Sequence, residues 1–141
     1  RDLLEPMAYR QKVLFVCREN ACRSQMAGAF AQHYAGDRID VATGGSQPAG
    51  AVNPIMVEVM QEKGIDMAFR SPQTIETALG NGPPATIVTM GCREACPHVP
   101  GARMLDWDLP DPSGQGLDVM REVRDQIEDN VKKLVQEFSE T

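Results

Sequence analysis

The chain has 141 residues and a mass of 15.4 kDa, enough for one hydrophobic core and too few for two large domains. Apolar residues make up 42% of the sequence and charged residues 24%, a balance typical of globular domains and not of disordered chains. A net charge of -6 argues against non-specific binding to nucleic acid or to anionic membranes, although a local anion site is compatible with it.

The apolar runs are shorter than a membrane span requires, and the first residues lack the apolar region of a signal peptide. We therefore expect a cytoplasmic protein with no membrane partner and no nucleic-acid partner. In the reducing cytoplasm its four cysteines are expected to be catalytic, redox-active or metal-binding rather than structural disulfides.

Residues 1–11 show no clear periodicity and are expected to form an N-terminal extension, so that residues 12–141 make a single domain. Short apolar runs predict strands over 12–16, 39–43, 85–90 and 102–105. Apolar residues at helical spacing predict helices over 23–34, from Pro54 to about Gly64, and over about 117–138, with a short helix and loops within 65–83. This alternation predicts a three-layer α/β fold, a four-stranded parallel sheet with helices on both faces.

The loop between the first strand and the first helix carries the most informative chemistry. Cys17 ends the strand, and Arg23 follows it by six residues at the start of the helix. Backbone N-H groups of such a loop, together with the helix N-terminus, form a concave anion site that also stabilises a thiolate. An arginine guanidinium binds two oxygens of an oxyanion, Ser24 is placed to donate to the thiolate, and Asn20 is expected to stiffen the loop. The sequence thus predicts a nucleophilic Cys17 beside an oxyanion site.

A strand followed by C-x5-R-S, with Asn20 inside the loop, resembles the low-molecular-weight protein tyrosine phosphatase superfamily. Its "CRSQMA" segment resembles the arsenate reductase branch, because the phosphatases usually have proline in place of Gln25. Asp111-Pro112 resembles the superfamily's Asp-Pro loop, and "VTMGCREACP" resembles the thiol-bearing segment of the reductases. The resemblance covers residues 12 to about 138 and implies the phosphatase-like fold.

The resemblance implies a thiol-dependent arsenate reductase. Cys17 would attack bound arsenate while Asp111 protonates the departing oxygen, and Cys92 would then attack Cys17 to release arsenite and form a disulfide. Cys96 would accept that disulfide from Cys92 and present it to an external thiol reductant, with thioredoxin favoured and no bound cofactor required. The resemblance implies that arsenate and other phosphate-like oxyanions are bound by the loop of Arg18, Glu19, Asn20, Ala21, Cys22, Arg23 and Ser24.

Three positions differ from the superfamily patterns. Glu19 replaces the glycine usual in phosphatases, so its carboxylate is expected to point away from a bound anion. Gly28 stands where many reductases have a glutamate that helps to hold potassium, so no metal ion is expected. Ser113-Gly114 follows the Asp-Pro pair where phosphatases usually have aromatic residues.

Three alternatives stay open at this point. Cys22 is either a bystander in the loop or the partner of Cys17 in a protective disulfide. The chain is a reductase, a phosphatase acting on phosphotyrosine or small phosphoesters, or a non-catalytic module in which the four cysteines bind metal or arsenic. Asp106 and Asp108 are rivals of Asp111 for the role of general acid.

Overall fold

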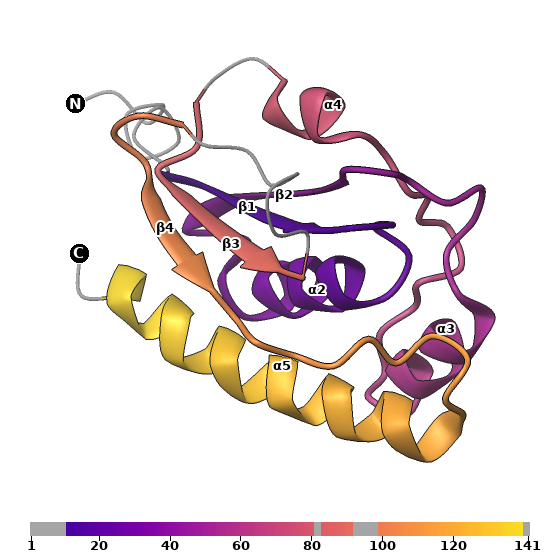
Figure 1. Ribbon diagram of the computed structural model, residues 1–141. Helices are drawn as coiled ribbons and strands as arrows, with labels where there is room; N and C mark the ends of the chain where they lie inside the picture. Colours follow the sequence, from indigo (N-terminus) through magenta and orange to yellow (C-terminus); the bar gives the residue numbers. More distant parts are fainter. Residues whose placement is uncertain (1–10, 81–82, 92–98, 140–141) are drawn as a thin grey trace.

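The computed structural model describes residues 11–80, 83–91 and 99–139, and the account below concerns these residues. They form a parallel sheet with strand order β2-β1-β3-β4 (Figure 1). The strands are β1 (Gln11–Cys17), β2 (Ile39–Gly45), β3 (Thr86–Met90) and β4 (Arg103–Asp106). The helices are α2 (Arg23–Ala35), α3 (Pro54–Gln61), α4 (Ile75–Leu79) and α5 (Leu117–Ser139). The predicted α/β class and the parallel four-stranded sheet are confirmed.

The element boundaries differ from the predicted ones at a few residues. β1 begins at Gln11 rather than Lys12, because Gln11 pairs with Ile39 at the start of β2. α3 ends at Gln61, before Gly64, since a tight turn with backbone hydrogen bonds to Met60 and Gln61 follows the helix and places Gly64 at φ +76°.

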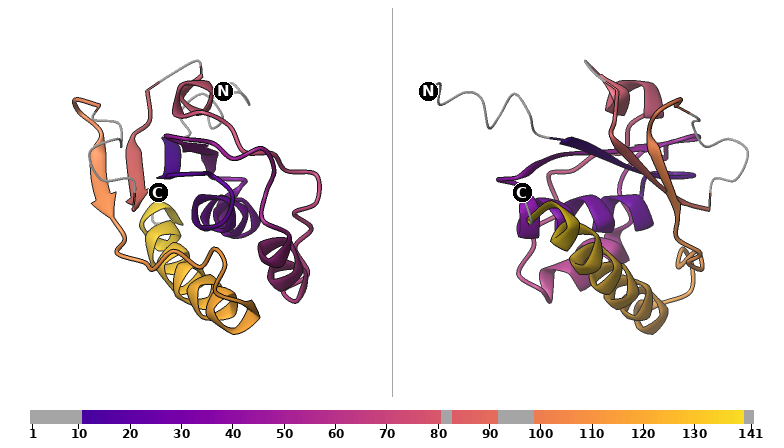
Figure 2. Two further views of the ribbon diagram at one scale, coloured as in Figure 1. Left: turned by 45° about the vertical axis from the view of Figure 1, so that its right-hand side comes forward. Right: turned by 90° about the vertical axis from the view of Figure 1, so that its left-hand side faces the viewer.

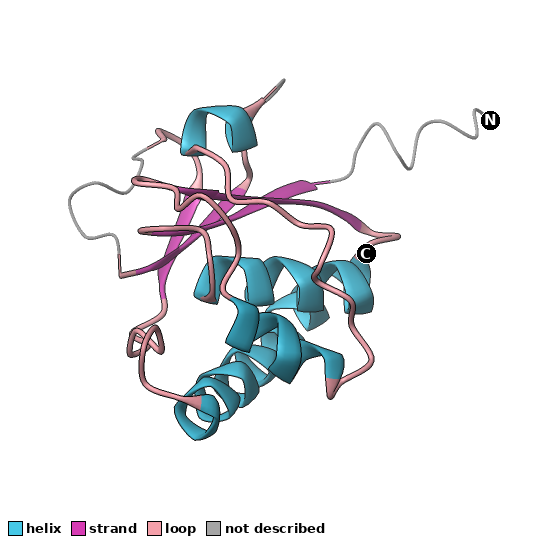
Figure 3. Cartoon of the chain, turned by 90° about the vertical axis from the view of Figure 1, so that its right-hand side faces the viewer, coloured by secondary structure: helices cyan, strands magenta, loops and turns pink. Residues whose placement is uncertain are grey.

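Helices cover both faces of the sheet, which explains why β1 is a continuous apolar run. Helices α2, α3 and α5 lie on one face and α4 lies on the other (Figure 3). Val13 and Phe15 are fully buried with the larger helical group, whereas Leu14 and Val16 are fully buried on the α4 side. A strand that is buried on both faces has no need of polar residues at alternate positions.

The carboxyl end of β1 lies between the carboxyl ends of β2 and β3, along one edge of the sheet. β1 pairs with β2 on one side and β3 on the other, and Cys17 lies opposite Gly45 and Met90 in the two registers. The carboxyl ends of all strands meet at this edge, which is where ligands bind in open parallel sheets (Figure 2). Across the described residues, no helix combines the length and apolar character that crossing a bilayer requires.

Candidate active site

The loop after β1 is held by backbone hydrogen bonds along its outer side. Four of its carbonyl groups accept from the segment 46–53: that of Cys17 from Ser46 (3.3 Å), Arg18 from Gln47 (2.7 Å), Glu19 from Ala49 (3.0 Å) and Ala21 from Asn53 (3.1 Å). In a trans peptide the N-H points away from the preceding carbonyl, so the N-H groups that follow these carbonyls face the other side of the loop. Amide groups turned to one side in this way form an anion-binding concavity.

Gly45 at the end of β2 allows the loop to approach so closely. A Cβ atom at Gly45 would lie 2.8 Å from the carbonyl oxygen of Arg18 and 2.9 Å from the backbone nitrogen of Asn20. Both atoms belong to the backbone and have little freedom to retreat. The sequence analysis did not predict this role of Gly45 in supporting the loop.

The Cys17 thiol lies at the centre of this loop and is 2% exposed. Its Sγ accepts a hydrogen bond from the backbone N-H of Asn20 at 3.3 Å and lies 2.9 Å from the hydroxyl oxygen of Ser24. Helix α2 begins at Arg23, one residue before Ser24, and the dipole at its N-terminus favours negative charge here. The first turn of α2 carries no acidic side chain that would oppose this effect. The backbone N-H of Asn20 and the hydroxyl of Ser24 are thus both within reach of the Cys17 sulfur.

Asn20 fixes the shape of the loop from behind. It is fully buried and adopts φ +54°, a left-handed conformation that asparagine tolerates better than most residues. Its Oδ1 accepts from the backbone N-H of Gln73 at 2.9 Å and from Nε2 of Gln25 at 3.1 Å, and its Nδ2 donates to Ser24 at 2.7 Å. The expected stiffening role of Asn20 therefore has specific partners in the structure.

Gln25 joins this network from the first turn of α2. Its Nε2 lies within hydrogen-bond distance of the backbone and side-chain oxygens of Asn20 and of the carbonyl oxygen of Ser71. Gln25 is 1% exposed, so these bonds replace those it would make to water. In the sequence Gln25 marks the resemblance to the reductase branch, but its contacts were not predicted, and one of them is to Ser71, almost 50 residues away.

Arg23 lies beside the thiol with its guanidinium nearly buried. Its Nη1 donates to the carbonyl oxygen of Leu109 at 3.2 Å, and its Nη2 lies 4.0 Å from the Asp111 carboxylate. The side chain of Arg23 is 9% exposed, whereas that of Asp111 is 60% exposed. A guanidinium held in this way has donors left for an oxyanion and little freedom to move away from one.

A small pocket opens between the Cys17 loop and the loop that carries Asp111. It is lined by Cys17, Arg18, Glu19, Ala21, Cys22, Arg23, Asp111 and Ser113. Asp106 and Asp108 line a separate hollow with Gly91 and Trp107 instead, so of the three candidate aspartates only Asp111 lines the thiol pocket. Asn20 and Ser24 have buried side chains and support Cys17 from behind rather than line the pocket.

Ser113 was not predicted as a site residue. Its backbone N-H donates to Asp111 Oδ1 at 3.0 Å, and its hydroxyl oxygen lies 3.7 Å from the thiol of Cys22. A small serine therefore occupies a wall where the related phosphatases usually carry aromatic residues. The pocket suits a small inorganic oxyanion.

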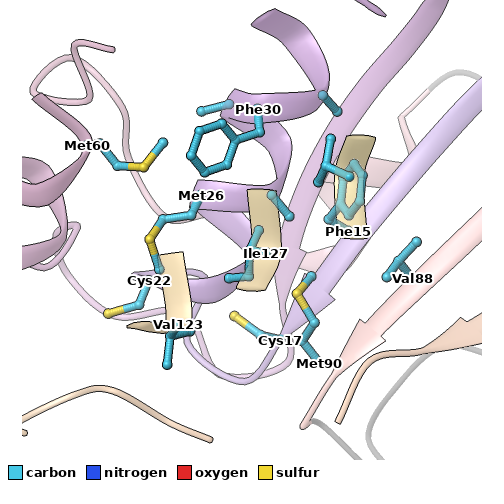
Figure 4. Close-up of a cluster of buried hydrophobic side chains, with 14 of the residues drawn as sticks. Phe15, Cys17, Cys22, Met26, Phe30, Met60, Val88, Met90, Val123 and Ile127 are labelled. Carbon is cyan, nitrogen blue, oxygen red and sulfur yellow. The ribbon is translucent and has the colours of Figure 1, made fainter. Parts of the chain in front are cut away.

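Cys22 lies at the edge of the apolar core with Met26 and Val123 (Figure 4). Burial raises the pKa of its thiol from 9.0 to about 11, outweighing the hydrogen bond with Ser113, which lowers it. Cys17 and Cys22 are both free in the structure. A protonated thiol is a poor nucleophile, so these observations favour the bystander interpretation of Cys22.

Two pairs of predicted residues remain. Arg18 and Glu19 are exposed, and Nε of Arg18 donates to Gln47 Oε1 at 3.1 Å. Cys92 and Cys96 lie outside the described residues. Within the residues that are described, no group of three or more histidine, cysteine, aspartate or glutamate side chains is arranged to hold a metal ion.

Gly28 has no room for a larger residue. A Cβ atom built on it would lie 2.3 Å from Cγ2 of Thr43. The side chain of Thr43 therefore occupies the space that the Cβ atom of a glutamate at residue 28 would need.

The sequence profile of the low molecular weight phosphotyrosine protein phosphatase family matches residues 12–141. The chain belongs to this family. The match covers both the Cys17 loop and Asp111, so the family assignment rests on the same segments that build the pocket.

Members of this phosphatase family that resemble the chain include arsenate reductases. A relative from Halobacterium salinarum is 38% identical over 130 residues, which are 89% of this chain and 91% of that protein. The glutaredoxin arsenate reductase of a Synechocystis species is 36% identical over 131 residues, covering 92% of this chain and 99% of the relative. Both names describe arsenate reductases.

Among solved structures, the thioredoxin-dependent arsenate reductase of Corynebacterium glutamicum superposes with a TM-score of 0.79 at 32% identity. The superposition covers 92% of this chain but 62% of that protein, so this chain spans slightly less than two thirds of its length. The predicted superfamily and its reductase branch are thus supported by both sequence and fold.

Proposed function

We propose that this member of the phosphatase family reduces arsenate to arsenite with Cys17 as the nucleophile. The observation that carries the proposal is the environment of the Cys17 sulfur, which combines a backbone N-H, the Ser24 hydroxyl and the N-terminus of α2. This environment supports a thiolate next to a pocket for a tetrahedral oxyanion. The relatives named as arsenate reductases supply the identity of that oxyanion.

In the first step the Cys17 thiolate attacks the arsenic atom of bound arsenate. A sulfur-arsenic bond forms and one arsenic-oxygen bond breaks, with Asp111 donating the proton that lets the oxygen leave as water. Arg23 and the loop N-H groups hold the remaining oxygens and balance their charge. No electron has yet passed to arsenic.

In the second step the Cys92 thiolate attacks the sulfur of Cys17. The Cys17-Cys92 disulfide forms as the sulfur-arsenic bond breaks, and its electron pair stays on arsenic, which leaves as arsenite. Cys96 then attacks Cys92, which frees Cys17 and moves the disulfide to Cys92 and Cys96. Two thiols are oxidised for each arsenate that is reduced.

An external dithiol must reduce this last disulfide before the next turnover. We propose thioredoxin, because the three-thiol relay delivers a disulfide rather than a mixed thiol adduct and because the Corynebacterium relative is named as thioredoxin-dependent. Glutaredoxin is the reductant to compare with thioredoxin, because the Synechocystis relative is named as a glutaredoxin arsenate reductase. Such a cycle fits the reducing cytoplasm, where we place the protein.

The family name itself motivates a second candidate, hydrolysis of a phosphate ester. That reaction needs a phosphocysteine at Cys17 and a general acid, and it has no use for Cys92 or Cys96. The small Ser113 wall of the pocket offers no aromatic surface to a phosphotyrosine ring, which favours the reductase.

One pair of assays separates the candidates. Arsenite production is measured with thioredoxin, thioredoxin reductase and NADPH, beside hydrolysis of p-nitrophenyl phosphate, for the wild type and for Cys17→Ser and Cys92→Ser. We expect both variants to lose multi-turnover arsenate reduction, and any ester hydrolysis to be lost only in Cys17→Ser. Full arsenate turnover by Cys92→Ser would overturn the relay. Arsenate turnover by Cys17→Ser would overturn the assigned nucleophile, whereas absence of turnover in the wild type would favour a non-catalytic binding module.

A further inference from the structure

Gly91 follows the last residue of β3 and lies directly against the guanidinium of Arg23. Its φ is +89°, and a Cβ atom built on it would lie 2.6 Å from Nη1, 3.3 Å from Cζ and 3.4 Å from Nη2 of Arg23. The first of these distances is shorter than non-bonded carbon and nitrogen atoms tolerate. A side chain at residue 91 would therefore occupy the space in which the guanidinium of Arg23 lies.

We infer that Gly91 is a positioning residue for the oxyanion site. Because glycine has no side chain, the guanidinium of Arg23 has room to face the pocket. The inference rests on the proposed function, in which Arg23 binds the oxyanion. Gly91 itself is not among the residues that line the thiol pocket and acts through the arginine.

A side chain at residue 91 would displace the atom of Arg23 that makes its hydrogen bond to Leu109. Nη1, the atom nearest the built Cβ, is also the atom that donates to the carbonyl oxygen of Leu109. Moving Nη1 away from residue 91 therefore breaks or bends that hydrogen bond. Because the side chain is nine-tenths buried, the guanidinium is displaced relative to the pocket when it moves.

Gly91 also precedes Cys92, the second thiol of the proposed relay. Arg23 therefore contacts the chain at the residue where the thiol-bearing segment begins. A substitution at Gly91 affects both the oxyanion site and the start of that segment, so arsenate turnover alone cannot assign its effect. Binding of inorganic phosphate requires the oxyanion site but none of the relay chemistry, and it is the appropriate readout.

The chain offers a matched control at Gly101. Its φ is +87°, close to that of Gly91, but a Cβ atom at Gly101 would meet nothing within 4 Å. Alanine at either position carries the same backbone strain, whereas only alanine at residue 91 meets Arg23. The comparison therefore separates strain from displacement of the guanidinium.

The test measures the Kd of inorganic phosphate and the Tm for the wild type, Gly91→Ala and Gly101→Ala. We expect Tm to fall in both variants, and further in Gly91→Ala because the Arg23–Leu109 bond is also disturbed. Only Gly91→Ala is expected to bind phosphate with a Kd at least about tenfold weaker, as loss of a charge-assisted hydrogen bond would produce. Equal phosphate affinity in the two variants would overturn the inference.

Two further variants keep the test decisive. Gly91→Asn also introduces a Cβ but tolerates a positive φ better, so it replaces Gly91→Ala if the alanine variant does not fold. In an Arg23→Lys background we expect substitution of Gly91 to weaken phosphate binding by less than about twofold, since the guanidinium is gone. A full additional loss in that background would show that Gly91 acts elsewhere. Failure of the proposed function has another signature, namely no arsenite production by the wild type, and wild-type phosphate affinity in Arg23→Ala would show that Arg23 does not bind the oxyanion.

Discussion

The side-chain nitrogen of Asn20 donates a hydrogen bond to the hydroxyl oxygen of Ser24 at 2.7 Å, and this bond decides what Ser24 does to Cys17. The other end of the Asn20 amide accepts from the backbone N-H of Gln73, which identifies it as the oxygen. Because Ser24 accepts from Asn20, its own hydrogen is free to point at the Cys17 sulfur 2.9 Å away. A thiolate has no hydrogen to donate, so in the proposed nucleophilic form of Cys17 the Ser24 hydroxyl is the donor of this bond.

Removal of this hydroxyl in Ser24→Ala is expected to lower kcat/KM for arsenate about tenfold. A hydrogen bond to a charged group contributes about 1.5–3 kcal/mol, and its loss makes the Cys17 thiolate less favourable. The measurement is steady-state arsenate reduction together with the rate of Cys17 alkylation by iodoacetamide at pH 7, which should also fall. Ser71→Ala is the control, because exposed Ser71 contacts Gln25 only through its carbonyl oxygen among the bonds described. Unchanged alkylation in Ser24→Ala would contradict the assigned donor.

Asn20 has two roles, which two substitutions separate. Asn20→Gly tolerates φ +54° but loses the side-chain bonds to Gln73, Gln25 and Ser24, whereas Asn20→Ala loses the bonds and adds strain. We expect the free energy of unfolding to fall by about 2 kcal/mol in the glycine variant and by about 1 kcal/mol more in the alanine variant. Urea unfolding measures both. Equal stability of the two variants would show that the left-handed conformation costs alanine nothing here.

Cys22 provides a prediction for alkaline pH. Burial raises the pKa of its thiol from 9.0 to about 11, so folding favours the protonated form. The corresponding stabilisation is complete below about pH 9 and is lost as the pH rises through 11. Alkylation by iodoacetamide, followed by mass spectrometry, should modify Cys17 at pH 7, while the rate at Cys22 should still rise about tenfold per pH unit between pH 9 and 10. A plateau of the Cys22 rate above pH 9 would contradict the raised pKa.

Glu62 provides a prediction for acid pH. Hydrogen bonds from Arg121 and Arg124 of α5 lower the pKa of Glu62, just after α3, from 4.5 to about 2. The ion pairs therefore stabilise the fold above about pH 4.5, and this stabilisation is lost as the pH falls towards 2. Glu62→Gln should lower the urea midpoint at pH 7 and reduce its dependence on pH between 5 and 2. Glu122→Gln, at an exposed position of α5, serves as the control. The same acid dependence in Glu62→Gln and wild type would refute the assignment.

The sequence predicted the sheet well because local patterns determine it. β1 is recognisable as a continuous apolar run because both faces of the strand are buried, and α5 is recognisable because its buried residues recur at helical spacing. The Cys17 loop was predictable because its reactive residues lie within eight positions of one another.

The support of that loop was not predictable in the same way. The contacts that support the loop and Arg23 come from main-chain atoms, which every residue type carries. They are the backbone of segment 46–53, the backbone N-H of Gln73 and the carbonyl group of Leu109. Gly91 belongs to the same class, since its importance lies in the space beside Arg23 and not in a functional group. Only the tertiary structure brings such atoms to the site.

The central claim is that internal thiols supply the two electrons that reduce arsenate, and a single-turnover measurement tests it most directly. Fully reduced enzyme is mixed with excess arsenate without any external reductant, and arsenite and free thiols are counted after denaturation. The relay predicts about one arsenite per chain and a fall in free thiols from four to two, since Cys17 is released when Cys92 and Cys96 pair. Absence of arsenite while all four thiols remain would contradict the account.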